Sequence, residues 1–338
     1  MKHTKQGRLN KIHAYSRLGR SIIHSNSSHS MSINWYPGHM HKARKEILAA
    51  LNNIDILIEV VDARLPYSSQ NPIIANLRHN KPTIIVLNKC DLADPDVTQQ
   101  WQDYYQSHDN VKTVTCQQNM PEKTRKILDT CKDIASEKDA SFKAINAMIL
   151  GIPNVGKSTI INTLAGRIIA KTGNEPAVTK RQQKINLEHS IMLHDTPGIL
   201  WPKIENTHSG YRLAISGAIK DTAMEYDDVG YYAAEYLMEY YSPLLQKRYR
   251  LEVMPQQVIQ FLEQMGSKRG AKQAGGRVNI HKTCEILLHE FRQGLIGNIT
   301  LERPHMMEKE MAEFEEEQRR KKAAKEQRKN NFKANRKA

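Results

Sequence analysis

The sequence Gly151-Ile152-Pro153-Asn154-Val155-Gly156-Lys157-Ser158 links an apolar run at 144–150 to a helical pattern. It fits G-x-x-x-x-G-K-[ST], whose glycines let the backbone curl until several N–H groups converge on phosphate oxygens. A helix that starts near Lys157 adds the attraction of its positive end. We expect Lys157 to reach the β- and γ-phosphates and Ser158 to ligate Mg²⁺. The loop therefore predicts a nucleotide site, formed by Asn154, Val155, Gly156, Lys157, Ser158 and Thr159.

Short β-branched runs alternate with helical stretches on both sides of this loop. Such alternation predicts a doubly wound, mostly parallel α/β sheet that binds ligands at the carboxyl ends of its strands. A helix is expected over residues 40–53. The expected strands are 54–62, 83–87, 111–116, 144–150, 184–187 and 190–194, the last two forming a hairpin over Glu188-His189.

A second phosphate-side motif, Asp195-Thr196-Pro197-Gly198, closes the last of these strands. A carboxylate at this position can hold Mg²⁺ through water, and the Gly198 N–H can contact a γ-phosphate. The same four residues also suit an ordinary turn. Their place after a strand and downstream of the phosphate loop favours the metal site.

The residues that recognise the base are expected in Asn88-Lys89-Cys90-Asp91, which follows the strand at 83–87. In N-K-x-D the carboxylate accepts hydrogen bonds from guanine N1–H and the exocyclic amine, Asn braces the pocket, and the Lys stem covers the base. Adenine offers neither donor, so the carboxylate would remain unpaired, which can reject adenine by about 10⁴-fold. This motif predicts GTP rather than ATP as the ligand.

The motif order is reversed from ordinary GTPases, in which N-K-x-D follows the other two motifs. Here Asn88–Asp91 precedes both Gly151–Ser158 and Asp195–Gly198. Because the loops emerge from one edge of a sheet and domain termini commonly lie close together, a circular permutation can leave such a site intact. The chain then runs from the Asp195–Gly198 loop almost directly into the next domain.

These blocks resemble the circularly permuted ribosome-assembly GTPases. The resemblance covers residue 31 to about residue 304. It implies a GTP-hydrolysing switch that binds GTP, GDP and Mg²⁺ and acts in late maturation of the large ribosomal subunit, with a helical C-terminal domain on ribosomal RNA. The matching blocks are Asn34-Trp35-Tyr36-Pro37-Gly38-His39-Met40, Asp62-Ala63-Arg64, Asn88–Asp91, Gly151–Thr159 and Asp195-Thr196-Pro197-Gly198-Ile199-Leu200-Trp201-Pro202.

The resemblance also implies roles for residues in loops of less specific sequence. Thr179, in Pro176-Ala177-Val178-Thr179, matches the threonine that binds the γ-phosphate and Mg²⁺, although the family's glycine is missing from this loop. Thr115-Cys116 replaces the usual Ser-Ala on the base side. Asn154 matches the asparagine associated with stimulation by K⁺.

The group that orients the attacking water is expected outside the phosphate motifs. Ras-like enzymes place a Gln directly after D-x-x-G, but here that residue is Ile199, which cannot hydrogen-bond. The resemblance points to His39, whose neutral imidazole could accept a hydrogen bond from the water. Without the resemblance, His39 would be interpreted as an exposed loop residue or a helix cap.

The chain divides into four expected segments: a basic disordered extension (1–30), a circularly permuted GTPase domain (31–204), a helical RNA-binding domain (205–304) and a charged tail (305–338). In the helical domain, tyrosines between Val229 and Tyr240 share one helix face, which favours a buried stripe over rings that stack on RNA bases. Further helices are expected from Met254-Pro255 to Gly266 and over 280–292. The charged tail predicts a solvated helix that frays, either as a solubilising tail or as an arm that touches RNA.

Four cations crowd the loop around Gly275-Gly276, where the backbone could approach phosphates. This loop is either an RNA contact or a solvated turn. The candidates are Lys268, Arg269, Lys272 and Arg277.

The composition of the 338 residues narrows the class of partner. The net charge of +14 indicates a polyanion, and the resemblance specifies the precursor of the large ribosomal subunit and its rRNA rather than DNA. No run approaches the ~18 apolar residues of a membrane helix. Four scattered cysteines favour reduced thiols, and we expect a cytoplasmic protein.

Three other functions remain open at this point. An RNA-binding protein with a regulatory or vestigial nucleotide site is disfavoured by the intact Lys157, Ser158 and Asp195. A signalling GTPase is disfavoured by the basic charge and the absence of lipidation signals. An organellar ribosome-assembly GTPase would account for the acid-free leader, which contains both Arg and Ser.

Overall fold

The computed structural model describes residues 38–72, 81–138, 144–170, 183–200, 204 and 206–335, and two neighbouring strands of its sheet are completely buried. In β1 (Ile56–Asp62) and β2 (Thr83–Asn88) every residue is buried, because helices cover both faces. The remaining strands are β3 (Val111–Thr115), β4 (Ile145–Gly151), β5 (Gln183–Leu187) and β6 (Ile191–Asp195).

The strand order β3-β2-β1-β4-β6-β5 confirms the doubly wound, mostly parallel sheet. Only β5 is antiparallel within it, and it forms the expected hairpin with β6 across a short turn, η2 (Glu188–Ser190). His189 and Ser190 adopt left-handed φ values of 66° and 57° in that turn. All six expected strands are present, with ends shifted by one or two residues.

Alternating side chains of β2 separate the two faces of the sheet. Ile84 and Val86 pack in the larger core, whereas Ile85 and Leu87 pack in a second core around Trp101. The nucleotide half contains the helices α2 (Gly38–Ala50), α4 (Pro95–Gln106), α5 (Pro121–Lys138) and α6 (Lys157–Ala165), with the short η1 (Leu51–Asn53) after α2.

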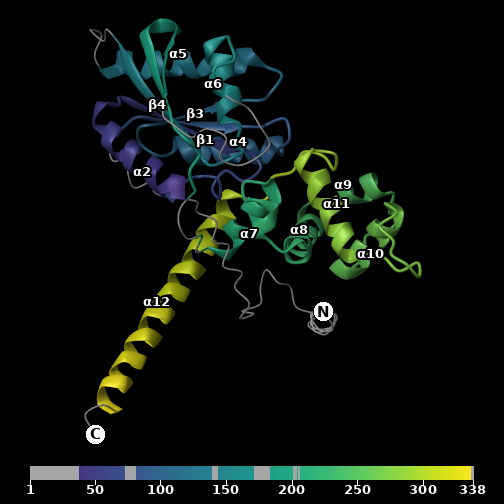
Figure 1. Ribbon diagram of the computed structural model, residues 1–338. Helices are drawn as coiled ribbons and strands as arrows, with labels where there is room; N and C mark the ends of the chain where they lie inside the picture. Colours follow the sequence, from purple (N-terminus) through teal and green to yellow (C-terminus); the bar gives the residue numbers. More distant parts are fainter. Residues whose placement is uncertain are drawn as a thin grey trace.

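A helical part packs beside this half (Figure 1). Its main helix, α8, packs against α7, α10 and α11. Tyr232 and Tyr236 of α8 are buried, which confirms the expected buried stripe. The helices of this part are α7 (Thr207–Ser216), η3 (Asp221–Ala223), α8 (Tyr226–Tyr240), α9 (Ser242–Tyr249), α10 (Val258–Lys268) and α11 (Ile280–Arg292).

The predicted limits of α10 are wrong at both ends. The helix starts at Val258 rather than at Met254-Pro255, because Gln257 still has extended backbone (φ −110°, ψ 139°). It continues past Gly266, which marks a close packing contact instead of a cap. A Cβ on Gly266 would lie only 2.3 Å from Oγ1 of Thr283 in α11.

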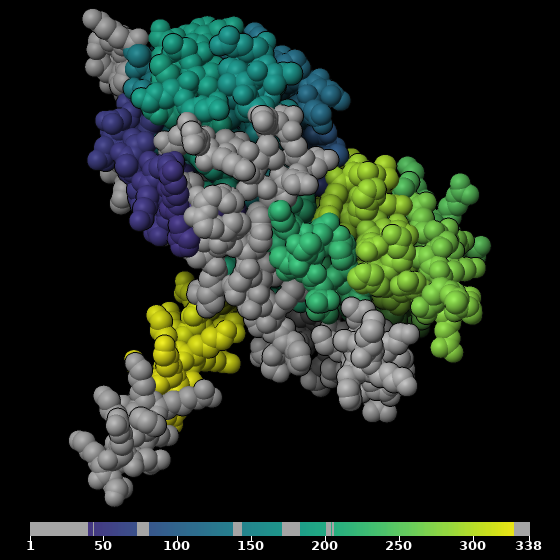
Figure 2. All heavy atoms as spheres, in the orientation of Figure 1, coloured from purple at the N-terminus to yellow at the C-terminus, as the bar shows by residue number. Residues whose placement is uncertain are grey.

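The last helix, α12 (Pro304–Asn335), extends for 32 residues away from the body. Its first turns are yellow in Figure 2 and protrude from the molecular surface. Along it, acidic residues pair with basic residues one turn later: Glu315 with Arg319, Glu316 with Arg320, and Glu317 with Lys321. The expectation of a single solvated helix is confirmed for these residues.

Within the part of the chain described, no helix combines the length and apolar character needed to cross a membrane.

Candidate functional site

The carboxyl ends of the parallel strands bring the three sequence motifs to one edge of the sheet. The N-K-x-D motif follows β2, the phosphate loop follows β4, and Asp195 ends β6. β1 lies between β2 and β4, so the chain departs in opposite directions on its two sides. Such a switch point is where open α/β sheets bind their ligands.

The phosphate loop requires left-handed backbone at two positions. Asn154 and Gly156 have φ values of 63° and 92°, and α6 begins directly afterwards. Gly156 is also constrained by a neighbour, because a Cβ there would lie 2.2 Å from Nδ2 of Asn88. The sequence predicts that this glycine lets the loop curl. The structure adds that it makes room for the base motif.

Lys157 and Asp195 form an ion pair where the phosphate loop meets β6. Both side chains are buried. Burial lowers the pKa of Lys157, and the Asp195 carboxylate opposes this shift. The second carboxylate oxygen of Asp195, Oδ2, is buried and accepts no hydrogen bond from any residue that the structure describes. A hard, unpaired carboxylate oxygen suits Mg²⁺ and its coordinating water, so Asp195 fits the expected metal.

The loop after Asp195 is held against the phosphate loop by its backbone. Thr196 Oγ1 donates to the Ile149 carbonyl at 2.8 Å, and the Ile199 N–H donates to the Gly151 carbonyl at 3.3 Å. This places Gly198 beside the phosphate loop. Ser158 lies half-buried in the first turn of α6, next to the exposed Thr159.

Two residues of the N-K-x-D motif reach across to the phosphate loop. Asn88 Nδ2 donates to the Val155 carbonyl at 2.7 Å, and Lys89 Nζ donates to the Asn154 carbonyl at 2.6 Å. Lys89 adopts a left-handed φ of 62°, which turns its side chain in this direction. The structure thus brings together the phosphate-side and base-side residues that the sequence singled out.

The base-side loops also contact each other through their backbones. The Cys90 N–H donates to the Cys116 carbonyl at 3.1 Å, and the Cys116 N–H donates to the Leu87 carbonyl at 2.9 Å. Burial raises the pKa of the Cys116 thiol to about 12, so this side chain is neutral and enclosed. Thr115 is half-buried beside it, whereas Asp91 is exposed at the rim.

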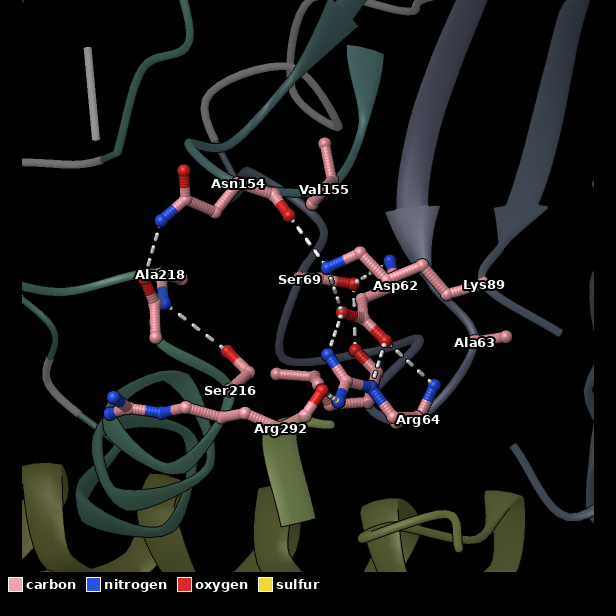
Figure 3. Close-up of polar contacts among 12 residues, drawn as sticks. Asp62, Ala63, Arg64, Ser69, Lys89, Asn154, Val155, Ser216, Ala218 and Arg292 are labelled. Atoms are coloured by element: carbon pink, nitrogen blue, oxygen red, sulfur yellow. Dashed lines mark hydrogen bonds and ion pairs between the residues drawn. The ribbon is translucent and has the colours of Figure 1, made fainter. Parts of the chain in front are cut away.

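Asp62 and Arg64 supply contacts to which sequence analysis assigned no role (Figure 3). Lys89 Nζ lies 2.9 Å from Asp62 Oδ2, and Arg64 binds the same carboxylate through Nε and Nη2 at 2.9 and 2.8 Å. Burial alone would raise the pKa of Asp62. The charges of Arg64 and Lys89 outweigh burial and hold it well below its usual range. The resemblance of Asp62-Ala63-Arg64 to a family block was the signal that could have identified these residues. Nothing in the local sequence indicates that Asp62 contacts Lys89.

These contacts extend into the helical part. Arg64 Nη1 donates to the Arg292 carbonyl at 3.4 Å, and the Arg292 guanidinium donates to the Ile215 and Ala214 carbonyls at 2.9 Å each. Asn154 Nδ2 donates to the Gly217 carbonyl, just after α7, at 2.7 Å. The phosphate loop, the base motif and the helical part therefore belong to one hydrogen-bonded ring.

Two expected catalytic residues cannot be placed. Thr179 lies outside the described residues. The backbone of His39 lies in the first turn of α2, but its side chain also lies outside them.

The RNA candidates lie in the helical part, away from this edge. Arg269 binds Glu290 at 2.9 Å and its guanidinium lies over the Tyr249 ring, whereas Lys268, Lys272 and Arg277 are exposed.

Comparisons with known proteins agree with this geometry. Residues 146–235 match the family model described as 50S ribosome-binding GTPase. Ribosome biogenesis GTPase A of Priestia megaterium is 44% identical over 287 residues, which cover 82% of this chain and 99% of that protein. Mitochondrial ribosome-associated GTPase 1 of mouse is 30% identical, covering 80% of this chain and 90% of that protein.

Solved structures match over most of their length. YlqF with GDP bound has a TM-score of 0.56 at 27% identity, covering 77% of this chain and 99% of that one. YlqF from T. maritima with GNP bound has a TM-score of 0.54 at 28% identity, covering 78% and 98%. With a phosphate loop, an N-K-x-D motif and a buried carboxylate at one sheet edge, this chain belongs to the ribosome biogenesis GTPase A family and is a guanine-nucleotide-binding GTPase.

Proposed function

We propose that this GTPase acts in late assembly of the large ribosomal subunit and contacts rRNA through its helical part. The observation that carries the hydrolytic role is the buried Asp195 carboxylate, which pairs with Lys157 through one oxygen and keeps the other for a cation. The match to a 50S ribosome-binding model and the names of the relatives support the ribosomal role. The reaction is hydrolysis of GTP to GDP and phosphate.

In this proposal the nucleotide contacts both groups of motif residues. Asp91 reads guanine, supported by Asn88, Lys89, Thr115 and Cys116. Ser158, Thr179 and Asp195 hold Mg²⁺, which neutralises charge on the phosphates when it is bound. The backbone of Gly198 and of the phosphate loop donates hydrogen bonds to phosphate oxygens.

The group that orients water has to come from outside the loop after Asp195. Ile199 is buried in the core and has an apolar side chain, its N–H donates to the Gly151 carbonyl, and its own carbonyl accepts from Asn71 Nδ2 at 2.9 Å. We propose His39 for this role. A neutral imidazole can accept a hydrogen bond from water and align it for in-line attack.

The RNA contact is proposed for the loop after α10. Lys268, Lys272 and Arg277 are exposed and have no carboxylate within ion-pair distance among the described residues. Cations of this kind bind phosphates and release counterions. We place the protein in the cytoplasm, with its ribosomal partner.

Stimulation by K⁺ through Asn154 is part of the proposal. Its Nδ2 is bonded to the Gly217 carbonyl, which fixes the orientation of the amide and hence of its carbonyl oxygen. Comparing GTP turnover in KCl with turnover in NaCl at equal ionic strength tests this point. Equal rates in the two salts contradict it.

The decisive experiment is GTP turnover alone, with large subunits and with small subunits. We expect stimulation by large subunits only. His39→Ala should bind GTP and the large subunit normally but lose most of the stimulated hydrolysis. Stimulation equal to that of the wild type would exclude His39, and equal binding of ATP and GTP would overturn the base assignment.

A further inference from the structure

The loop that carries the N-K-x-D motif, residues 88–94, is called the base loop below. It is bonded to a segment that lies more than two hundred residues later in the chain. We name residues 298–300, which follow α11, the strap. Asn298 Nδ2 donates to the Asp91 carbonyl at 2.9 Å and to the Ala93 carbonyl at 3.0 Å. The Ile299 N–H donates to the Leu92 carbonyl at 3.0 Å. Each residue from Asp91 to Ala93 therefore has its carbonyl bonded to the strap.

The strap also binds Asp94, the residue after Ala93. Oγ1 of Thr300 accepts from the Asp94 N–H at 3.1 Å and donates to the Ala63 carbonyl at 3.4 Å. Thr300 is fully buried, so its hydroxyl links the base loop to the loop after β1 without competition from water.

Side chains of the helical part fix Thr300 in turn. Its N–H donates to Oη of Tyr241 at 3.1 Å, and its carbonyl accepts from Oη of Tyr236 at 3.0 Å. Both tyrosines are buried. The strap is thus anchored on one side by α8 and its C-terminal end, and bonded to the base loop on the other.

We propose that Thr300 is a positioning residue for guanine recognition. This proposal rests on the proposed function of Asp91 as the residue that recognises the guanine base. Because the Asp91 carboxylate is exposed, its position is set by the backbone that carries it. Asn298 binds the Asp91 carbonyl directly, and Thr300 fixes the same loop three residues later through the Asp94 N–H. Through the strap, the helical part therefore sets how well the carboxylate meets the two guanine donors.

The test compares GTP with inosine triphosphate, whose base lacks the exocyclic amine that Asp91 is proposed to bind. A hydrogen bond to a charged group supports a preference for GTP of roughly tenfold to a hundredfold. Thr300→Val keeps the size of the side chain but removes the hydroxyl. We expect it to reduce this preference by about fivefold and to raise KM for GTP while kcat changes by less than about twofold.

Matched variants separate positioning from stability. Thr300→Ser retains the hydroxyl and should restore the preference for GTP. Phe261→Leu, in α10, lowers the melting temperature through the core of the helical part and should leave the preference unchanged. If Thr300→Val does not fold, Asn298→Ala, at an exposed position, should shift the preference in the same direction by a smaller factor.

The outcomes distinguish this proposal from the proposed function. A Thr300→Val protein that keeps the wild-type preference for GTP overturns the positioning role, even if it melts earlier. The same holds for Asn298→Ala if it is the variant measured. A wild-type protein with no preference for GTP over inosine triphosphate contradicts the base-reading role of Asp91 itself.

Discussion

At the residue scale, the buried carboxylate of Asp62 links the base motif to the helical part through two ion pairs. It forms ion pairs with both Arg64 and Lys89, which in turn contact the helical part and the phosphate loop, respectively. Removing one member of such a buried set leaves the others without a counterion, which typically costs about 3–5 kcal/mol. We therefore expect a change at Asp62 to affect both stability and nucleotide binding.

We expect Asp62→Asn to lower the free energy of unfolding by about 3 kcal/mol and to weaken GTP and GDP binding alike, because Lys89 loses the partner that orients it. Denaturant unfolding and nucleotide titration measure the two effects. Asp55→Asn is the matched control, since Asp55 accepts from the Asn146 N–H near the opposite end of β1 at 2.8 Å. Normal nucleotide affinity in Asp62→Asn would contradict the role.

The unfolding free energies of wild type and Asp62→Asn should depend differently on pH. The pKa of Asp62 is below its ordinary value of 3.8 in the folded state, so the unfolded chain takes up the proton first as the pH falls. The stability that Asp62 contributes is complete above about pH 4 and is lost below it. The difference in unfolding free energy between wild type and Asp62→Asn should shrink when unfolding is measured at successively lower pH. A constant difference would exclude ionisation as its origin.

The proposed function makes base choice depend on Asp91. Asp91→Asn replaces an acceptor with an amide that can donate to O2 of xanthine, so the variant should lose GTP affinity and gain affinity for xanthosine triphosphate. Competition binding with both nucleotides measures the change. Retention of the wild-type preference would assign guanine recognition to another residue.

At the scale of elements, the local sequence predicts those strands and helices whose apolar pattern is clear within the element itself. Strands β1, β2, β4 and β6 were predictable because their largely buried apolar runs stand out between polar loops, whereas β3 and β5 each bury only one residue. Helices α7 and α9 were not identified. Helix α7 buries Ser209 and Arg212 beside its apolar residues, and α9 buries only Leu245 and Tyr249, so neither shows a clear apolar stripe. The motif residues could be found, but their partners Asp62, Gly217 and Thr300 depend on tertiary contacts.

The loop after α10 is a small hairpin whose cations differ in their surroundings. Lys272 pairs with Val278 in an antiparallel bridge, and Gln273 N–H donates to the Arg277 carbonyl at 2.9 Å. Arg269 belongs to the fold, because it binds the largely buried Glu290. Lys268, Lys272 and Arg277 remain available to phosphates.

Replacing Lys268, Lys272 and Arg277 with Gln should weaken large-subunit binding and reduce the slope of log K against log salt by about two to three. GTP affinity of the free protein should not change. The control replaces Lys112 and Lys282, which pair with Glu137 and Glu285. An unaltered slope in the triple variant would assign the RNA contact to another surface, such as α12.

At the scale of the whole molecule, buried ion pairs join the last helix to both halves. Arg212 of α7 binds Glu310 of α12 through two hydrogen bonds of 2.8 and 2.6 Å, and lies 3.5 Å from the buried Glu302. Glu302 in turn accepts from the N–H and hydroxyl of Ser68, in the nucleotide half, at 2.8 and 2.6 Å. The N-terminal end of α12 is therefore held by buried ion pairs, whereas residues 311–327 are mostly exposed.

Glu310→Gln should lower the unfolding free energy by about 2–3 kcal/mol, because the buried Arg212 keeps only one carboxylate. A chain that ends at Glu317 retains this anchor and should unfold like the full chain. Denaturant titrations of both variants test the anchor. Equal stability of Glu310→Gln and wild type would show that Glu302 alone compensates the charge.

The bond between Asn298 and Asp91 spans 207 residues, and this separation bears on biosynthesis. At about 5–20 residues per second, a ribosome needs roughly 10–40 s to add the strap after it has made the base loop. During that interval the nascent chain contains N-K-x-D without its anchor. On the proposed role of Thr300, full selectivity for guanine therefore develops only after the strap has been synthesised and has folded against residues 91–94.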